Sequence, residues 1–191
     1  FTEGSLTGTF TFTAPSTTQG GAALSGDLTY YIVANGDTIG KGQTTAGAAV
    51  ATTAAVKAAG SYRLEVLTRN AAGYSQPARA QVGWAGYDTP HTDSVHLEID
   101  KTSRQTTLSW HTPLKGIHGG YINPDKLRFD VYRLPGNVKV ASQTADSVFT
   151  ETLPEGERML YSYAVVPFND TLMGDTAYSA EKSLGSYYTV P

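Results

Sequence analysis

The sequence contains no cysteine, and this absence removes several kinds of chemistry at once. The chain has no disulfide, no thiolate ligand for a metal and no cysteine nucleophile. Charge is also scarce, because only 16% of the 191 residues are charged and the net charge is -3 at pH 7. Nucleic acids and anionic membranes bind cationic surfaces, so we expect neither to be the main partner.

Long hydrophobic runs are missing as well. No stretch of 18 apolar residues occurs, so we predict no membrane span in this segment. The sequence begins at Phe1 and not at methionine, and we therefore interpret it as a mature or trimmed part of a longer polypeptide. Apolar residues make up 40% of the chain, and its 12 Tyr and 20 Gly favour a packed protein rich in strands and turns.

The chain contains two copies of one unit. Tyr62 begins an every-second-residue apolar pattern that returns 99 residues later at Tyr161. The same offset relates residues 20–32 to residues 119–131, where a pair of glycines precedes a second alternating pattern. A near-constant offset over such a span predicts a tandem duplication.

Each copy has the alternation of β-strands, in which residues two apart share a face. Leu28, Tyr30 and Ile32 alternate with Thr29 and Tyr31, and the apolar residues that follow Tyr62 at every second position alternate with Arg63 and Glu65. The alanine-rich segment 46–60 has the propensity of a helix, but the spacing of its valines and its pair of threonines favour a strand. We therefore predict that this segment is a strand.

The ordered set of motifs resembles the fibronectin type III family, whose members are sandwiches of two antiparallel sheets. Trp110 stands where that family has a core Trp on the second strand, and Phe12 takes its place in the first copy. Tyr62 and Tyr161 match the Tyr that begins the sixth strand and bonds back to the preceding corner. The structural core that this resemblance implies centres on Phe12, Tyr62, Trp110 and Tyr161.

The resemblance implies an all-β chain of two tandem immunoglobulin-like (fibronectin type III) β-sandwiches, at residues 1–88 and 89–191. The first strand of the first domain is expected to be short or to lie upstream of Phe1. Pro167 interrupts the sixth strand of the second copy, so we expect an edge or a bulge there.

The segment 116–136 and the junction 86–90 also resemble modules of large surface proteins of Gram-negative gut bacteria. This resemblance implies an extracytoplasmic setting, secreted or at the cell surface. We expect a non-catalytic spacer and interaction module of a larger exported bacterial protein, with adhesion as its context. Its partners would be neighbouring domains of the same polypeptide and protein or glycan at the cell surface. The alternative is a carbohydrate-binding accessory pair of a polysaccharide-degrading system.

No catalytic motif emerges from the sequence. Residues 73–77 (Gly-Tyr-Ser-Gln-Pro) lack the last glycine of a nucleophile elbow, and the glycines of residues 40–45 precede no helix that could hold a phosphate. The histidines lack the i, i+4 pairing of zinc enzymes, and the acidic residues lack calcium-loop spacing. We therefore predict that the chain is not an enzyme and has no catalytic residue, metal site or cofactor.

The long glycine-rich loop 115–125 is the best candidate for recognition. An aromatic ring beside amide and carboxylate groups could hold a sugar, because the ring packs on CH groups while polar groups bind hydroxyls. The loop could equally be a structural turn, since the first copy keeps the glycine pair and lacks the tyrosine. Its candidate ligand-binding residues are His118, Tyr121, Asn123 and Asp125.

Aspartates followed by Ser or Thr are over-represented. Six of the ten Asp residues have such a neighbour, and in five cases an apolar residue comes next. This pattern resembles the O-glycosylation signal of exported proteins in one Gram-negative bacterial group. The same pairs also start turns through side-chain to backbone hydrogen bonds, so a structural role stays open. The implied acceptors are Thr38, Ser94, Ser147, Thr171 and Thr176.

Overall fold

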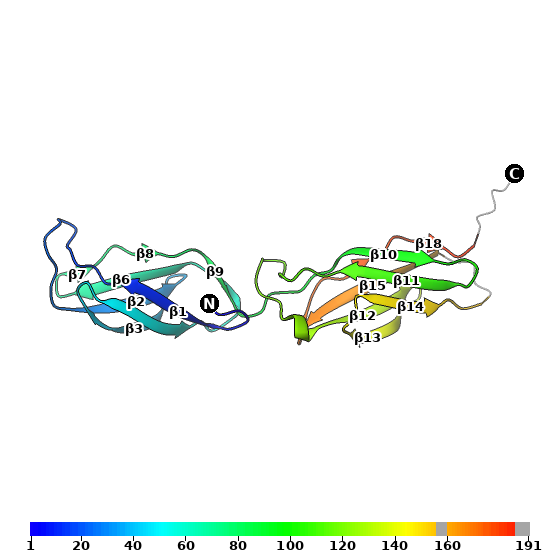
Figure 1. Cartoon of the computed structure of the whole chain (residues 1–191), viewed down its shortest axis with the longest axis horizontal. Helices are drawn as coiled ribbons and strands as arrows, with labels where there is room; N and C mark the ends of the chain where they lie inside the picture. The colour runs from blue at the N-terminus through cyan, green and yellow to red at the C-terminus, as the bar shows by residue number, and fades with distance from the viewer. Residues whose placement is uncertain (156–159, 186–191) are drawn as a thin grey trace. The chain divides into compact units, whose positions relative to one another are not determined.

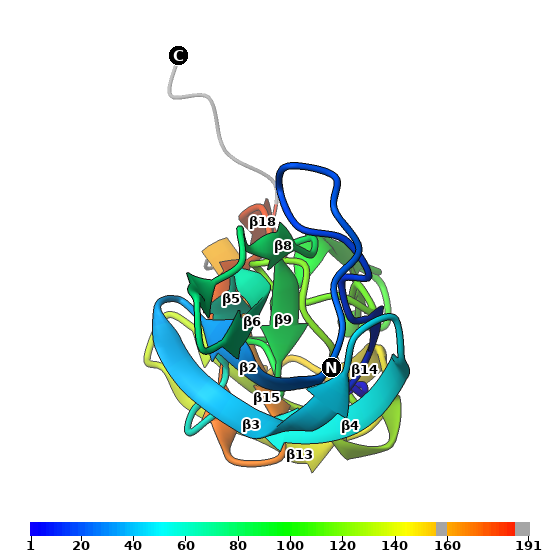
Figure 2. The same ribbon diagram turned by 90° about the vertical axis from the view of Figure 1, so that its left-hand side faces the viewer.

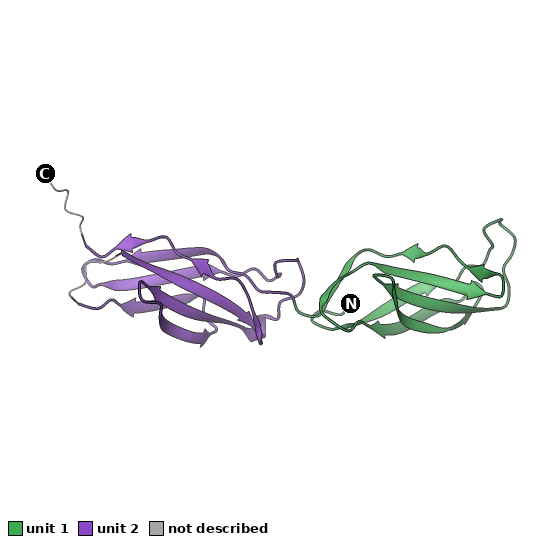
Figure 3. Cartoon of the chain, turned by 180° about the vertical axis from the view of Figure 1, so that it is seen from behind, with its two compact units in different colours: residues 1–87 green, residues 88–191 purple. Residues whose placement is uncertain are grey.

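The computed structural model describes residues 1–155 and 160–185 and divides the chain into two compact units, Phe1–Tyr87 and Asp88–Pro191 (Figure 3). Apart from one short 3₁₀ turn, the described regular elements are all strands, which confirms the predicted fold class. The division falls one residue before the sequence-based boundary, because Asp88 is hydrogen-bonded to a loop of the second unit. No helix among the described residues is long and apolar enough to cross a bilayer.

Unit 1 is built from short antiparallel sheets (Figures 1 and 2). β1 pairs with β4, and β5 pairs with β9. The largest sheet has the order β3-β2-β6-β7, with β8 also paired to β6. These strands are β1 (Thr7–Thr13), β2 (Asp27–Ala34), β3 (Asp37–Thr45), β4 (Ala49–Ala55), β5 (Gly60–Tyr62), β6 (Leu64–Asn70), β7 (Gly73–Tyr74), β8 (Ala78–Arg79) and β9 (Gly83–Ala85).

Unit 2 has the same plan with one more strand beside the first sheet. Its sheets have the orders β10-β11-β14 and β13-β12-β15-β16, and β17 and β18 also pair with β15. The elements are β10 (Asp93–Ile99), β11 (Gln105–His111), the 3₁₀ turn η1 (Pro124–Lys126), β12 (Leu127–Leu134), β13 (Val138–Thr144), β14 (Val148–Thr152), β15 (Leu160–Asn169), β16 (Leu172–Met173), β17 (Ala177–Tyr178) and β18 (Lys182–Ser183).

The strand registers reproduce the duplication seen in the sequence. Tyr31 of β2 faces Leu67 of β6, and the positions 99 residues later, Asp130 and Val166, face each other between β12 and β15. The next sheet edge follows the same rule, since the pairing of β6 with β7 is repeated at that offset between β15 and β16. Equivalent positions in the two units can therefore be compared directly.

The alanine-rich segment and Pro167, which the sequence singled out as unusual for strands, both lie in strands. The alanine-rich segment forms strand β4, whose residues alternate between exposed and more buried positions opposite β1. Pro167 lies within β15, which is flanked by β12 on one side and by β16 and β17 on the other. β16 pairs with β15 at residues 168 and 169, and β17 pairs with it at residues 164 and 165. Pro167 lies between these two pairings, so its missing N–H interrupts no ladder on the side of β16 and β17.

Each unit has its own hydrophobic core. In unit 2, Trp110 is 6% exposed and packs with Phe129 at 5.3 Å between ring centroids. Tyr161 is also buried, at 2% exposure. In unit 1, by contrast, Phe12 and Tyr62 are half-buried and pack at the margins of two smaller clusters. The Tyr62 hydroxyl donates to the carbonyl oxygen of Ala58 at 2.9 Å, which is the bond back to the corner that the family resemblance implied.

The shallower position of Phe12 has a simple cause. Its strand β1 pairs only with β4 in the described residues 1–87, whereas β11, which carries Trp110, lies between β10 and β14. A two-stranded sheet covers less of the side chains beneath it than a three-stranded one.

Candidate functional site

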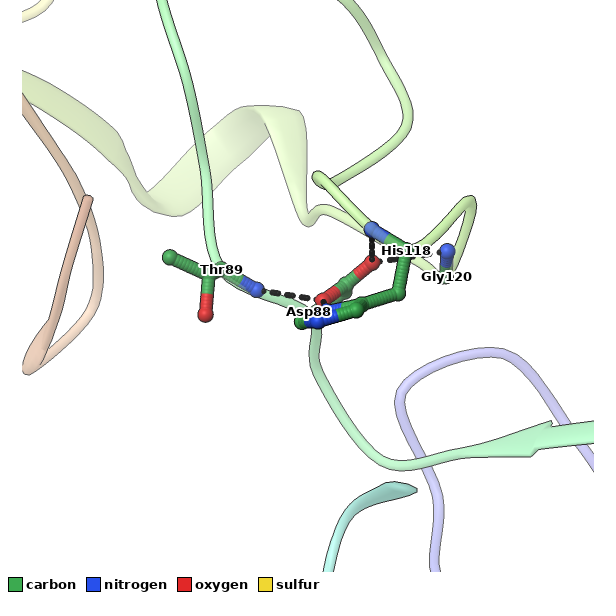
Figure 4. Close-up of polar contacts among 4 residues, drawn as sticks. All are labelled: Asp88, Thr89, His118 and Gly120. Atoms are coloured by element: carbon green, nitrogen blue, oxygen red, sulfur yellow. Dashed lines mark hydrogen bonds and ion pairs between the residues drawn. The ribbon is translucent and has the colours of Figure 1, made fainter. Parts of the chain in front are cut away.

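The candidate recognition loop of unit 2 is organised around one buried carboxylate (Figure 4). Asp88 is 1% exposed and accepts hydrogen bonds from both ends of the loop's glycine-rich turn. Its Oδ2 accepts from the backbone N–H of His118 and of Gly120, both at 2.9 Å. Its Oδ1 accepts from the N–H of Thr89 and contacts His118 Nδ1, both at 2.8 Å. The carboxylate thus ties the first residues of unit 2 to a loop that is 30 residues away in sequence.

Opposing effects set the pKa of Asp88. Burial raises the pKa of this carboxyl, whereas the hydrogen bonds from the His118 side chain and from the N–H groups of Gly120, His118 and Thr89 lower it. The donors prevail, and the pKa lies below its ordinary value. The charged form is therefore the one that the folded unit holds.

The loop also encloses Asp88 sterically. A Cβ atom on Gly116 would lie 2.4 Å from Asp88 Cγ, which is closer than any real contact of this kind. The N–H of Asp88 donates to the carbonyl oxygen of Tyr121 at 2.9 Å, and the N–H of Ile117 donates to that of Thr89 at 3.0 Å. Glycine at position 116 is thus required by space.

Two of the predicted ligand-binding residues of this loop make separate structural contacts. His118 faces Asp88, while the Asn123 side chain accepts from the N–H of Asp125 at 3.0 Å and caps η1. The carbonyl oxygen of Asp125 accepts from Arg128 at 3.0 Å. These contacts are those of a structural turn, the alternative that the sequence left open.

A second polar cluster of unit 2 is also internal. The Tyr163 hydroxyl donates to Glu151 Oε1 at 2.5 Å, and Arg133 donates to Glu151 Oε2 at 2.6 Å. Burial and the neighbouring carboxylate raise the pKa of Tyr163, so the phenol stays protonated. No group of three or more His, Asp or Glu side chains suited to a metal occurs in the described part of the chain.

The five implied glycosylation acceptors all lie on the surface. The hydroxyl-bearing residue is exposed in each case, and so is the aspartate before it. The sixth Asp-Ser/Thr pair, Asp88-Thr89, differs, because Asp88 is buried and its carboxylate is engaged with the loop. That pair also lacks the apolar third residue, since Pro90 follows. The exposed acceptors are Thr38, Ser94, Ser147, Thr171 and Thr176.

Unit 1 has a hollow on its surface. It has a volume of about 450 Å³ and lies between the loop that joins β1 to β2 and the segment around β7. In Figures 1 and 2 that first loop, drawn in dark blue, stands out from the sandwich. The lining includes one cation and no carboxylate. Its polar side chains are Thr17, Thr18, Gln19, Thr68, Arg69, Asn70, Tyr74, Ser75 and Gln76.

Beside the hollow, four side chains form a row that we call the cation–aromatic strip: Lys41, Tyr31, Tyr74 and Arg69. The rings of Tyr31 and Tyr74 contact each other at 5.7 Å between centroids with an interplanar angle of 51°. Lys41 lies 5.7 Å from the Tyr31 ring centroid, and Arg69 lies 5.1 Å from that of Tyr74. Tyr74 is 61% exposed, so the strip is open to solvent at the edge of the hollow.

The strip arises from cross-strand register. Tyr31 pairs with Lys41 of β3, and Arg69 of β6 pairs with Tyr74 of β7. The four residues therefore come from four adjacent strands and share the outward face of one sheet. Leu67, which faces Tyr31 across β2 and β6, completes this outward surface.

Unit 2 does not repeat the strip. The position of Tyr31 is taken by Asp130, whose carboxylate is buried and bonds to Lys139 Nζ at 2.7 Å. The positions of Arg69 and Tyr74 are taken by Phe168 and Met173. Because the backbone plan is shared, the strip is a property of unit 1 and not a requirement of the fold.

Among the described residues, neither Lys41 nor Arg69 forms an ion pair, although Arg79 on the same sheet pairs with Glu65 at 3.0 Å. Residues 1–87 contain five Lys and Arg against four Asp and Glu, a net charge of +1. Residues 88–191 contain nine against thirteen, a net charge of -4. Asp27, the first residue of β2, shares the outward face of that strand with Tyr31.

The sequence-based analysis did not find this surface. The available signals were the outward position of Tyr31 in an alternating strand and the tyrosine that follows the Asn-Ala-Ala-Gly turn. Neither signal shows that the two rings meet, because Tyr31 and Tyr74 come together only through the pairing of β2, β6 and β7.

Comparisons with known proteins identify no family for this chain. No family model matches the sequence, and no curated protein matches it. One similar solved structure is that of the FN1–FN3 domains of chicken CNTN1, which is 14% identical with a TM-score of 0.39. The match covers 91% of this chain and 65% of that one, which is less than two thirds of its length. The immunoglobulin-like fold of both units is established by their own strand order and pairing.

Proposed function

We propose that the chain is a non-catalytic spacer and interaction module of a larger exported bacterial surface protein. The observation that carries this proposal is the anchoring of the chain where it enters unit 2. When a spacer is under tension, the first residues of each folded unit must stay attached to that unit. The bonds from Asp88 to the N–H groups of His118 and Gly120 hold those residues at the point of entrance.

Two further observations support the spacer role and the exported setting of this proposal. Each unit has its own core, so each can keep its shape when the polypeptide is extended. The five Asp-Ser/Thr acceptors are exposed, as glycans on an exported protein require. Adhesion as the biological context remains part of this proposal and comes from the sequence resemblance alone.

Stretching single molecules between their two ends tests the mechanical part of the proposal. We expect two separate unfolding events, because the two cores are distinct. Unit 1 has 87 residues and unit 2 has 104, so the contour lengths released are about 30 nm and about 36 nm at ~3.5 Å per residue. The Asp88→Ala variant should lower the unfolding force of the longer event only. Continuous extension without discrete events would contradict a spacer role.

The cellular setting is tested in the native host. We expect an antibody raised against the folded chain to label intact cells, because the module is proposed to be outside the cytoplasm. A control antibody against a cytoplasmic protein should label only permeabilised cells. Labelling that also requires permeabilisation would exclude the proposed location.

Glycosylation is a separate expectation with its own measurement. The 191-residue chain, exported by itself in the native host, should exceed the 20.3 kDa of the bare sequence, and mass spectrometry should locate a glycan on Ser147. Asp146→Ala should remove that glycan, because the signal includes the preceding aspartate. The Thr89 hydroxyl is the internal control and should stay unmodified, since Asp88 before it is buried. An unmodified mass in the native host would refute this expectation.

A further inference from the structure

We propose that the cation–aromatic strip of unit 1 and the adjoining hollow bind a carboxylate-bearing saccharide. The proposal deepens the interaction role proposed above by giving it a place and a ligand class. It rests on three features of the described surface: an exposed ring with a partly buried ring beside it, cations without ion pairs, and a concave lining of hydroxyl and amide groups.

The aromatic part supplies the stacking surface. Sugar rings present patches of CH groups, which pack on the faces of aromatic side chains. Tyr74 is 61% exposed and lies at the rim of the hollow, with Tyr31 beside it at 5.7 Å. Tyr74 therefore offers an exposed ring, and Tyr31 lies partly buried beside it.

The cations give the selectivity for a carboxylate. Arg69 both lines the hollow and lies over the Tyr74 ring, 5.1 Å from its centroid, so a carboxylate held in the hollow would meet the guanidinium beside that ring. A guanidinium binds a carboxylate through two parallel hydrogen bonds, and such charge-assisted bonds are about twice as strong as neutral ones. Lys41 adds a second positive charge at the other end of the strip.

The lining of the hollow matches hydroxyl groups. Side chains of Thr17, Gln19 and Gln76 offer donors and acceptors there, and no carboxylate of the protein lines the hollow to repel an anion. An acidic peptide would satisfy the cations but would bring few hydroxyls to these groups. A volume of about 450 Å³ lies within the range of small-molecule sites. The combined chemistry therefore favours an acidic sugar over a peptide.

A nuclear magnetic resonance titration of the full 191-residue chain tests the proposal. The probes are oligomers of galacturonic acid and of glucuronic acid, and an oligosaccharide that ends in N-acetylneuraminic acid. We expect at least one of them to shift the backbone signals of Tyr31, Arg69 and Tyr74. The matched neutral ligand is the same oligomer with its carboxyl groups reduced to alcohols. It should bind about tenfold more weakly or worse, because it loses the charge-assisted bonds.

Single substitutions separate the aromatic from the charged contribution. Tyr74→Ala should weaken binding of both the acidic and the reduced oligomer by about tenfold, because it removes the stacking surface. Arg69→Gln should weaken only the acidic oligomer, down to the level of its neutral counterpart. Met173→Ala is the matched control, because Met173 occupies the position of Tyr74 in unit 2 and is likewise 61% exposed. That variant should bind like the parent chain.

Three results would overturn the proposal. The first is that none of the three acidic oligomers shifts the strip signals at about 10 mM, a concentration that detects even millimolar affinity. The second is that a polyglutamate peptide of equal charge binds the strip as tightly, which would identify a peptide site. The third is that Met173→Ala weakens binding as much as Tyr74→Ala. The stretching and labelling experiments use no ligand, so failure of the spacer proposal is measured separately.

Discussion

Replacing Asp88 with alanine will destabilise unit 2 by about 3 kcal/mol or more, the largest effect that we expect from a single polar side chain. The substitution leaves the N–H groups of His118 and Gly120 without their acceptor, and each unsatisfied buried donor costs about 1–3 kcal/mol. The loop also loses the atoms against which Gly116 packs. Unit 1 contains none of these contacts, so its stability should not change.

Denaturant unfolding can resolve the two units because each contains one tryptophan, Trp84 in unit 1 and Trp110 in unit 2. In a Trp84→Phe background, the fluorescence of Trp110 reports unit 2 alone. His118→Ala is the control, because it removes only the half-exposed imidazole and keeps the backbone donors in place. We expect that control to cost less than about 1 kcal/mol. Equal losses in the two variants would show that the imidazole, and not the buried carboxylate, holds the loop.

The Asp88 carboxylate also makes the stability of unit 2 depend on pH. In the unfolded chain this carboxyl titrates near its ordinary pKa of 3.8, and in the folded unit it titrates lower. The folded state therefore binds fewer protons between these two values, and stability falls as the pH decreases through them. Above the ordinary pKa, the full contribution is present.

Asp88→Asn should make this acid dependence shallower without removing it. The pKa of Asp100 is lowered by the N–H groups of Thr102 and Ser103. Burial raises the pKa of Asp130, but the hydrogen bonds from Lys139 and Gln143 lower it by more. Both carboxyls remain in the variant. Denaturant unfolding over a series of acidic pH values measures the change. An unchanged slope in Asp88→Asn would mean that this carboxyl does not contribute.

Trp110→Ala will cost unit 2 about 3–5 kcal/mol, the usual range for removing a buried aromatic side chain. Trp110 is 6% exposed and its ring packs on Phe129 within a core that β10, β11 and β14 cover from one side. The equivalent change in unit 1, Phe12→Ala, should cost only about 1–2 kcal/mol, because that ring is half-buried beneath a two-stranded sheet.

Hydrogen exchange measured by mass spectrometry suits this comparison, since it remains informative when a tryptophan is removed. Peptides from β12 report unit 2 and peptides from β2 report unit 1. Each substitution should accelerate exchange in its own unit and leave the other unit unchanged. Val138→Ala, at an exposed position of β13, is the control and should have little effect. A loss from Phe12→Ala as large as that from Trp110→Ala would show that both aromatics support their cores equally.

The unequal depth of these two rings shows how far the sequence could predict the fold. The period-two patterns predicted strands and the offset of 99 residues predicted the duplication, whereas the immunoglobulin-like class was implied by the family resemblance. The depth of Phe12 depends on how many strands cover it, and nothing near Phe12 in the sequence encodes that number. The same limit applies to Pro167, whose tolerance comes from the gap between β16 and β17.

The candidate sites were harder to predict for a related reason. Asp88 and His118 are 30 residues apart, and no spacing rule brings a junction aspartate to a glycine-rich turn. The sequence offered that turn either as a candidate for recognition or as a structural turn, and its aspartate partner lay outside the segment considered. In the cation–aromatic strip, every member comes from a different strand, so only the register of β3, β2, β6 and β7 assembles it.

The clasp between Asp88 and the turn at Gly116 sets a rule for transplanting unit 2 into other proteins. A cassette cut after residue 88 would leave behind the acceptor for two backbone amides while keeping the glycine that made room for it. A splice placed before residue 88 moves the aspartate and its turn together. Engineered chimeras of this unit should therefore tolerate the earlier junction and reject the later one.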